Sequence, residues 1–240
     1  MLPTLLMLPG TLCDERIFTR QRRALRGKVC LVCASYSRMK DRSRWLSKLL
    51  AGLPERFHVA GFSLGGLMAL ELLRIAPERI EGLALIASNA QPASLLSKRK
   101  SDRLRKLWLD RGPAEVAKQV KPAYFHHEAK RRQHQQLVFD MALGTPRRSA
   151  FEEFEWAAQR PDSLDDLAQF RGKLLAISGT QDRLCPPAWQ RAMLAAQPRM
   201  QWIEIPRCGH FLPLEAPSAL NHALEHWLLG GGFKYEVRDL

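Results

Sequence analysis

The pentapeptide Gly61-Phe-Ser63-Leu-Gly65 constrains the fold more than any other feature of this sequence. An apolar, strand-like run at residues 57–62 leads into it, and a helical stretch at residues 64–76 follows directly. A serine on a sharp strand-to-helix turn takes a strained backbone conformation. Side chains two residues away on either side would crowd that turn, and Gly61 and Gly65 have none. The segment therefore predicts a reactive Ser63 at the end of a strand.

Strand-like and helix-like segments alternate on both sides of this turn. The expected strands are residues 5–8, 29–33, 57–62, 83–87, 173–178 and 201–205. The expected helices include residues 14–25, 43–50, 64–76 and 217–229. This alternation predicts an α/β fold, with a mostly parallel central sheet flanked by helices on both faces.

A helical block interrupts this alternation after the fourth predicted strand. Residues 93 to about 160 contain several helical stretches and no convincing strand. We expect this block to lie over the C-terminal edge of the sheet, where open α/β sheets bind ligands. The predicted organisation is a core at 1–92 and 166–229, a helical cap subdomain at 93–165 and a C-terminal extension at 230–240.

A serine hydroxyl needs an adjacent base to act as a nucleophile, and histidine has a suitable pKa. His210 is the preferred candidate because it follows the last predicted strand, in a turn that aims its imidazole back over the sheet edge. His58 lies inside a strand and is expected to be structural. The remaining histidines are expected on solvated surfaces and lack the spacing of a metal site: His126, His127, His134, His222 and His226.

A carboxylate is needed to fix the tautomer of that imidazole, and Asp182 is the candidate. It lies in Ser178-Gly-Thr-Gln-Asp182, directly after the fifth predicted strand. For the oxyanion, the candidate donors are the backbone N–H of Leu64, next to the nucleophile, and that of Thr11, in the loop after the first strand. The sequence alone does not distinguish an oxyanion-binding loop at Thr11 from an ordinary turn at the end of a strand.

Composition limits the class of protein. The chain has 240 residues, of which 46% are apolar, so it can bury one sizeable core. Its five cysteines are an odd number at scattered positions, which favours a reducing, cytoplasmic location over a disulfide framework. The apolar first ten residues lack a basic region and a cleavage site and are interpreted as a buried strand, and no apolar run is long enough to span a membrane.

At this point the chain resembles the α/β-hydrolase superfamily, over roughly residues 3–229. The matching segments are LPGTLCD, GFSLGG, SGTQD, and CGHF followed by LPLEAPSAL. It looks closest to small capped bacterial carboxylesterases, such as the pimeloyl-ACP methyl ester esterases of biotin synthesis. It is also similar to a menaquinone-pathway synthase that uses the same triad for elimination. The resemblance implies a serine esterase with the triad Ser63, Asp182 and His210, without cofactor or metal.

The chain departs from the family pattern in two places. Many relatives carry His-Gly in the oxyanion loop, where this chain has Pro9-Gly10. A backbone donor survives that change. The chain also begins at what would be the third strand of the family, so about six strands are expected where eight are usual.

Of the 13 excess positive charges of the chain, nine lie in one segment within the predicted cap. The segment 98–148 holds 14 Lys and Arg against 5 Asp and Glu. Such a surface would steer an acidic partner, and an acyl carrier protein fits an ester hydrolase. Nucleic acid is disfavoured, although Trp108, Tyr124 and Phe125 lie among the cations, because no nucleic-acid module is visible. A non-catalytic binding protein on the same fold is a further alternative, as are a thioesterase and a lyase.

The cap is also expected to supply the substrate pocket. Leu12, Trp108 and Phe139 are predicted to bind substrate. The wider set of candidates, most of which are expected to form the core of the cap itself, adds Leu95, Leu104, Leu107, Val138 and Phe154.

Overall fold

The computed structural model describes residues 2–120, 124–126 and 131–230. Its centre is a parallel sheet of six strands in the order β2-β1-β3-β4-β5-β6. The strands are β1 (Thr4–Leu8), β2 (Cys30–Cys33), β3 (Phe57–Phe62), β4 (Ile80–Ile86), β5 (Lys173–Gly179) and β6 (Gln201–Ile205). The prediction of an α/β fold built on a parallel sheet is confirmed.

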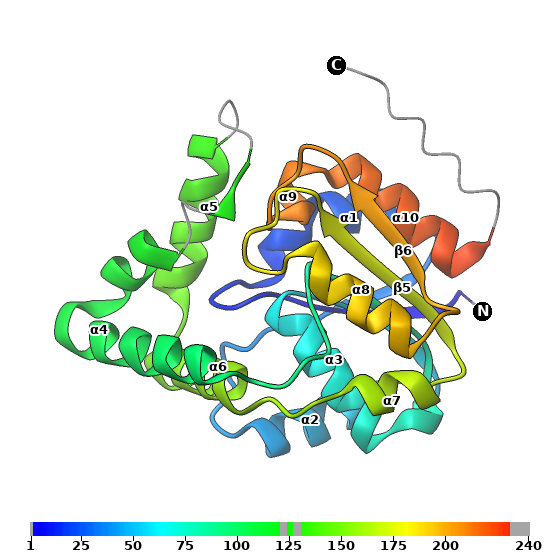
Figure 1. Ribbon diagram of the computed structural model, residues 1–240, viewed down its shortest axis with the longest axis horizontal. Helices are drawn as coiled ribbons and strands as arrows, with labels where there is room; N and C mark the ends of the chain where they lie inside the picture. The colour runs from blue at the N-terminus through cyan, green and yellow to red at the C-terminus, as the bar shows by residue number, and fades with distance from the viewer. Residues whose placement is uncertain (1, 121–123, 127–130, 231–240) are drawn as a thin grey trace.

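Helices cover both faces of the sheet (Figure 1). One face carries η1 (Glu15–Phe18), α1 (Thr19–Ala24), α9 (Leu212–Glu215) and α10 (Pro217–Leu229). The other carries α2 (Arg42–Ala51), α3 (Leu64–Ile75), α7 (Leu164–Gln169) and α8 (Pro187–Ala196), and η2 (Pro77–Arg79) leads into β4. Strand β1 contributes to both cores, because successive side chains of a strand alternate faces. Leu5 and Met7 pack toward α10, whereas Leu6 and Leu8 pack toward α3.

Three further helices lie between β4 and β5, as the sequence predicts. We call them the helical insert: α4 (Leu95–Val120), α5 (Arg131–Gly144) and α6 (Arg147–Gln159). They lie together at the left of Figure 1, on the side toward which the arrowheads of β5 and β6 point. Helix α4 is kinked where Gly112 adopts a φ of 80° before Pro113. The insert has a small core of its own, which includes Leu104, Trp108 and Phe154.

Several boundaries differ from the prediction. Strand β4 begins at Ile80, three residues earlier than predicted, because its backbone pairs with β3 from Phe57 onward. Helix α8 was not predicted, since it follows a Cys-Pro-Pro sequence that is typical of a loop. Apart from Gly230, the predicted C-terminal extension lies outside the described residues, and so does His127. No described helix is both long and apolar enough to cross a membrane.

The strand order determines where a site can form. The chain leaves β1 toward β2 at one side of the sheet, and β3 lies on the other side of β1. The loops after β1 and β3 therefore diverge, which opens a crevice at the C-terminal ends of these strands. Ser63 follows β3, Asp182 follows β5 and His210 follows β6, so all three lie at this edge.

Candidate active site

Ser63 occupies a tight turn between β3 and α3. Its backbone has φ 53° and ψ −114°, which non-glycine residues rarely adopt. The neighbouring glycines make this turn possible. A Cβ atom on Gly61 would overlap the backbone of Gly65, and one on Gly65 would overlap the carbonyl of Leu8. Both positions therefore exclude any larger residue.

Hydrogen bonds hold Ser63 in this strained conformation. Its N–H donates to the carbonyl oxygen of Ile86 at 2.8 Å. Its own carbonyl accepts from the N–H of Gly66 at 2.9 Å and from the hydroxyl of Ser88 at 2.8 Å. Strain of this kind persists only where the surroundings fix it, and it is found mainly at functional sites.

The structure brings the three predicted side chains into one hydrogen-bonded chain. His210 Nε2 lies 2.9 Å from Ser63 Oγ, and His210 Nδ1 lies 2.9 Å from Asp182 Oδ2. Asp182 Oδ1 accepts from the N–H groups of Leu184 at 2.8 Å and Cys185 at 2.9 Å. With both oxygens engaged, the carboxylate has a fixed orientation and holds the proton of the imidazole on Nδ1. Nε2 is then the nitrogen that can accept the proton of Ser63.

Close approach of two loops sets the distance from Asp182 to His210. The N–H of Thr180 donates to Ile205 at 3.0 Å, and the N–H of Gln181 donates to Cys208 at 3.0 Å. A Cβ atom on Gly179 would overlap the carbonyl of Cys208. The turn after β5 and the loop after β6 are thereby fastened to each other. Asp182 and His210 are almost fully buried as a result.

Two residues that the sequence analysis did not select fix the loop of His210. The carboxylate of Glu215 accepts from the N–H of Phe211 at 3.0 Å and from that of Gly209 at 3.3 Å. The N–H of His210 itself donates to the carbonyl of Tyr124 at 2.9 Å. The Tyr124 ring meets the imidazole edge to face, with centroids 5.9 Å apart. Glu215 lies in the LPLEAPSAL segment, which carries part of the family resemblance and could have pointed to this residue. Nothing in the sequence around Tyr124 indicates that it contacts the histidine.

The loop after β1 brings Thr11 to the same cavity as Ser63 and Leu64. Leu64 is the first residue of α3, so its N–H has no acceptor within the helix. The next residue after Thr11, Leu12, has a φ of 53°, and its N–H donates to Glu153 Oε2 at 2.6 Å. Glu153 is a buried carboxylate on α6. The helical insert thus holds the loop that contains the predicted oxyanion donor.

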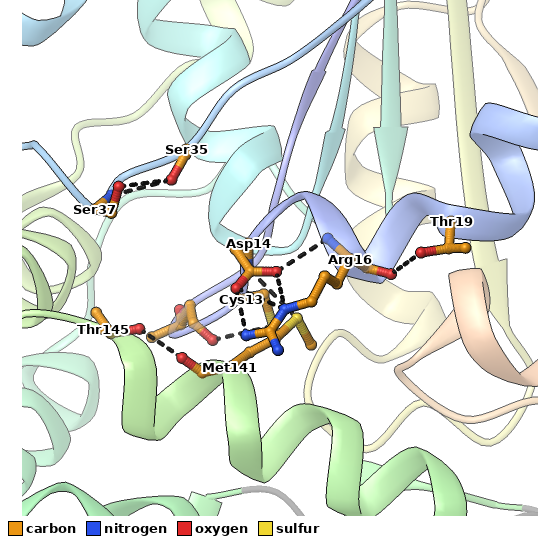
Figure 2. Close-up of polar contacts among 9 residues, drawn as sticks. Cys13, Asp14, Arg16, Thr19, Ser35, Ser37, Met141 and Thr145 are labelled. Carbon is orange, nitrogen blue, oxygen red and sulfur yellow. Dashed lines mark hydrogen bonds and ion pairs between the residues drawn. The ribbon is translucent and has the colours of Figure 1, made fainter.

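Figure 2 shows how the end of this loop is anchored. Asp14 caps η1 by accepting from the N–H of Arg16 at 3.0 Å, and its two oxygens face the Arg16 guanidinium at 2.7–3.1 Å. The N–H of Asp14 points to Met141 Sδ of α5 at 3.5 Å. In the next loop, the carbonyl of Ser37 accepts from Ser149 of α6 at 3.2 Å. The insert therefore contacts the loops after both β1 and β2.

A cavity of about 360 Å³ opens beside Ser63 and His210. Its apolar wall comes from both the sheet side and the insert, and includes Phe62, Leu67, Leu104, Phe154, Trp189 and Phe211. Ligand sites are commonly mostly apolar and of this size, with a few polar groups that fix orientation. The cavity can therefore enclose a small organic group attached to a carbonyl at Ser63.

The predicted substrate-binding residues Leu12, Trp108 and Phe139 do not line this cavity. Leu12 and Trp108 are buried in the core of the insert, and Phe139 packs against that core. The reason is that α4, α5 and α6 need an apolar interior of their own, which the large side chains fill. Among the wider candidates, Leu104 and Phe154 do reach the cavity wall.

Asp182, Cys185 and His210 form a cluster whose donor atoms lie within 4.8 Å of one another. Burial raises the pKa of the Cys185 thiol, and the charge of Asp182 raises it further. A protonated thiol is a poor metal ligand, and Asp182 and His210 already bond each other. The cluster is better explained as a buried thiol packed beside the hydrogen-bonded pair of Asp182 and His210.

Comparison with known proteins supplies the remaining evidence. A family model described as "Alpha/beta hydrolase family" matches residues 14–223. No curated protein matches the sequence significantly. Among solved structures, a thermophilic esterase from Thermogutta terrifontis is 27% identical, with a TM-score of 0.81 over 95% of this chain and 89% of that one.

Two more distant structures share the fold. An enol-lactonase from Burkholderia xenovorans LB400 is 19% identical, with a TM-score of 0.80 over 95% of this chain and 92% of that one. MenH from S. aureus is 15% identical, with a TM-score of 0.80 over 94% of this chain and 93% of that one. At such identities the likeness concerns the fold alone.

Proposed function

Because the chain belongs to the alpha/beta hydrolase family, we propose that it is a serine hydrolase that cleaves carboxylic esters. Ser63 is the nucleophile, His210 the general base and Asp182 the residue that orients the histidine. The observation that carries this proposal is the pair of 2.9 Å contacts that link Asp182 to His210 and His210 to Ser63 at the wall of a cavity.

The proposed reaction has two steps. His210 Nε2 accepts the hydroxyl proton as Ser63 Oγ attacks the ester carbonyl, and the N–H groups of Leu64 and Thr11 stabilise the oxyanion. His210 then donates this proton to the departing alcohol. In the second step a water gives a proton to His210 and attacks the acyl-enzyme. The carboxylic acid leaves, and the proton returns to Ser63.

For the natural substrate, we propose an acyl chain delivered as an ester on an acyl carrier protein, as in the esterases of biotin synthesis. The helical insert acts as a cap subdomain, residues 93–165, and residues of α4 and α6 in the cavity wall support this role. Acidic carrier proteins would meet the exposed cations of α4, which are Lys98, Arg99, Arg103, Lys106, Arg111 and Lys118. Their charge supports steering of an acidic partner.

A series of p-nitrophenyl esters, from acetyl to palmitoyl, tests the proposed activity. Wild type should hydrolyse the shorter esters, and Ser63→Ala and His210→Ala should each lose several orders of magnitude in kcat. Equal hydrolysis by wild type and Ser63→Ala would refute the assignment. If wild type cleaves thioesters and not oxygen esters, the same triad serves a thioesterase.

A further inference from the structure

The cavity beside Ser63 carries an excess of positive charge. Its wall includes Lys100 of α4 and Arg160, the residue that follows α6. Among the described residues that line it there is no Asp or Glu. Asp182 lies behind His210, bonded to the imidazole and to two backbone N–H groups. The space available to a substrate is therefore bordered by cations without a matching carboxylate.

Arg160 is half-buried and hydrogen-bonded only in part. Its Nε donates to the carbonyl of Gln91 at 3.1 Å, and its Nη1 donates to the carbonyl of Ala157. Within the described part of the chain its Nη2 has no partner, and no carboxylate faces the guanidinium. Burial lowers the pKa of Arg160, which means that the charged form is disfavoured at this position. An anion in the cavity would offset that penalty.

Lys100 is the second cation of the cavity wall. Its Nζ donates to Tyr124 Oη at 3.0 Å, and the Tyr124 ring contacts the His210 imidazole. In the described residues Tyr124 is its only hydrogen-bond partner. An ammonium group has three donors, so two remain for a ligand.

Both cations line the same cavity as the Cys185 thiol. The Cys185 thiol lies beside Asp182 and His210, and it also lines the cavity. Burial raises its pKa, whereas the charges of Arg160 and Lys100 both lower it. These two effects are smaller than that of burial, and Lys100, Arg160 and Cys185 all line the one cavity beside Ser63.

We propose that the Ser63 cavity selects esters whose acyl part carries an anionic group, a carboxylate or a phosphate, and that Lys100 and Arg160 are the residues that recognise it. This inference rests on the proposed esterase activity and not on the proposed delivery by a carrier protein, and it specifies a class of small ester substrates. The ester end of the substrate lies at Ser63, and the apolar wall packs against its acyl chain. Lys100 and Arg160 bind the anionic group at the distal end of that chain. Hydrogen bonds between charged groups are stronger than those between neutral groups, so we expect a large preference for anionic esters over neutral esters of equal length.

The test compares esters of equal length that differ only in the distal group. Monomethyl adipate carries a carboxylate where methyl hexanoate carries a methyl group, and the methyl ester of a phosphonoalkanoic acid of similar length carries a phosphonate. Methanol release gives kcat/KM for each. We expect at least one anionic ester to exceed the neutral ester about tenfold or more. The better of the two anions identifies the chemistry of the distal group.

Three variants assign this preference to residues. Lys100→Met and Arg160→Gln remove the charges, and Arg147→Gln removes an exposed cation of α6 that does not line the cavity. The measured quantity is the ratio of kcat/KM for the anionic ester to that for the neutral ester, which cancels a general loss of activity. The ratio should fall about tenfold in the first two variants and stay at its wild-type value in Arg147→Gln. A merely structural Arg160 would lower the melting temperature without changing the ratio.

Binding to Ser63→Ala keeps the inference separate from the proposed function. Calorimetry gives the Kd of monomethyl adipate, the phosphonate ester and methyl hexanoate without any turnover. Tighter binding of an anionic ester that is lost in the Ser63→Ala/Lys100→Met double variant supports the inference, even if wild type hydrolyses none of the esters. Equal Kd values for all three esters would overturn the inference, even if all three are hydrolysed.

Discussion

At the scale of single residues, the site depends on a few positions that tolerate no other side chain and on polar groups that hold them. The placement of Ser63, Asp182 and His210 at one edge of the sheet could be predicted because each lies in the turn or loop that follows a strand, in the order Ser, Asp, His. Glu153 could not be predicted in this way, and Glu215 was marked only by its place in the LPLEAPSAL segment. Their roles arise from contacts with backbone N–H groups that only the folded chain brings close.

Gly65→Ala tests the close approach of α3 to β1. The added Cβ would overlap the carbonyl of Leu8, so we expect a loss of about 2–3 kcal/mol in the free energy of unfolding. Gly52→Ala is the matched control. There the nearest atom lies at 3.6 Å, and the change should be neutral or stabilise by up to about 1 kcal/mol. Urea unfolding measures the stability of both variants. Equal effects of Gly65→Ala and Gly52→Ala would contradict the close packing of α3 against β1.

Glu153 is predicted to position the loop of Thr11. Glu153→Leu leaves the N–H of Leu12 without its acceptor, so the loop should shift and kcat should fall by at least about tenfold. KM should change little, because Glu153 does not line the cavity. Glu153→Gln retains an acceptor oxygen and should recover most of the lost rate. Steady-state kinetics with one ester measures kcat and KM of both variants. A change in KM with kcat unchanged would argue against a positioning role for Glu153.

At the scale of elements, the periodicity of apolar residues predicted most strands and helices. It failed where contacts with other parts of the fold lengthen a strand or stabilise an additional helix. Strand β3 and helix α10 begin and end as predicted, since their apolar patterns are uninterrupted. In β4 the polar Glu81 and the flexible Gly82 hid the start of the strand, which pairing with β3 defines. The location of the insert was predictable, but not the identity of the residues that reach the cavity. Packing among α4, α5 and α6 decides which side chains face inward.

His58 makes the stability of β3 sensitive to acid. Burial lowers its pKa, as does the charge of Lys173, although Glu81 and the backbone carbonyl of Thr4 act in the opposite direction. The unfolded chain therefore binds a proton at a higher pH than the folded one, so folding stability falls as pH drops through the ordinary value of 6.5. His58→Phe removes this titration and keeps a ring against Trp227.

Urea unfolding between about pH 7.5 and pH 5 measures this dependence. The free energy of unfolding of the wild type should decline more steeply toward acid than that of His58→Phe. If the free energies of unfolding of the two proteins changed with pH in parallel, His58 would not contribute to the acid sensitivity.

At the scale of the whole molecule, the sheet edge and the helical insert together enclose the site, and the segment 98–148 holds 14 Lys and Arg against 5 Asp and Glu. Composition alone gave the net charge of +13 and its concentration in one segment. It could not separate the exposed cations of α4 from Lys100 and Arg160, which reach the cavity. The two sets have different expected roles. The exposed set steers a macromolecular partner, and the cavity set recognises the substrate.

Replacement of Lys98, Arg99, Arg103 and Lys106 by Gln tests the steering role. For an ester carried on an acidic acyl carrier protein, kcat/KM at low salt should fall by about tenfold or more, and its dependence on salt should weaken. Hydrolysis of a small neutral ester serves as the control and should be retained. An equal loss with both substrates would indicate damage to the fold rather than loss of steering.

The most direct test of the central claim is covalent labelling of the intact protein with a fluorophosphonate, followed by peptide mass spectrometry. We predict a single adduct on Ser63, because among the residues that the structure describes this is the hydroxyl bonded to a histidine that a buried carboxylate orients. Labelling should fall sharply in His210→Ala. Absence of an adduct on Ser63 in the folded wild type, or labelling that persists unchanged in His210→Ala, would contradict it.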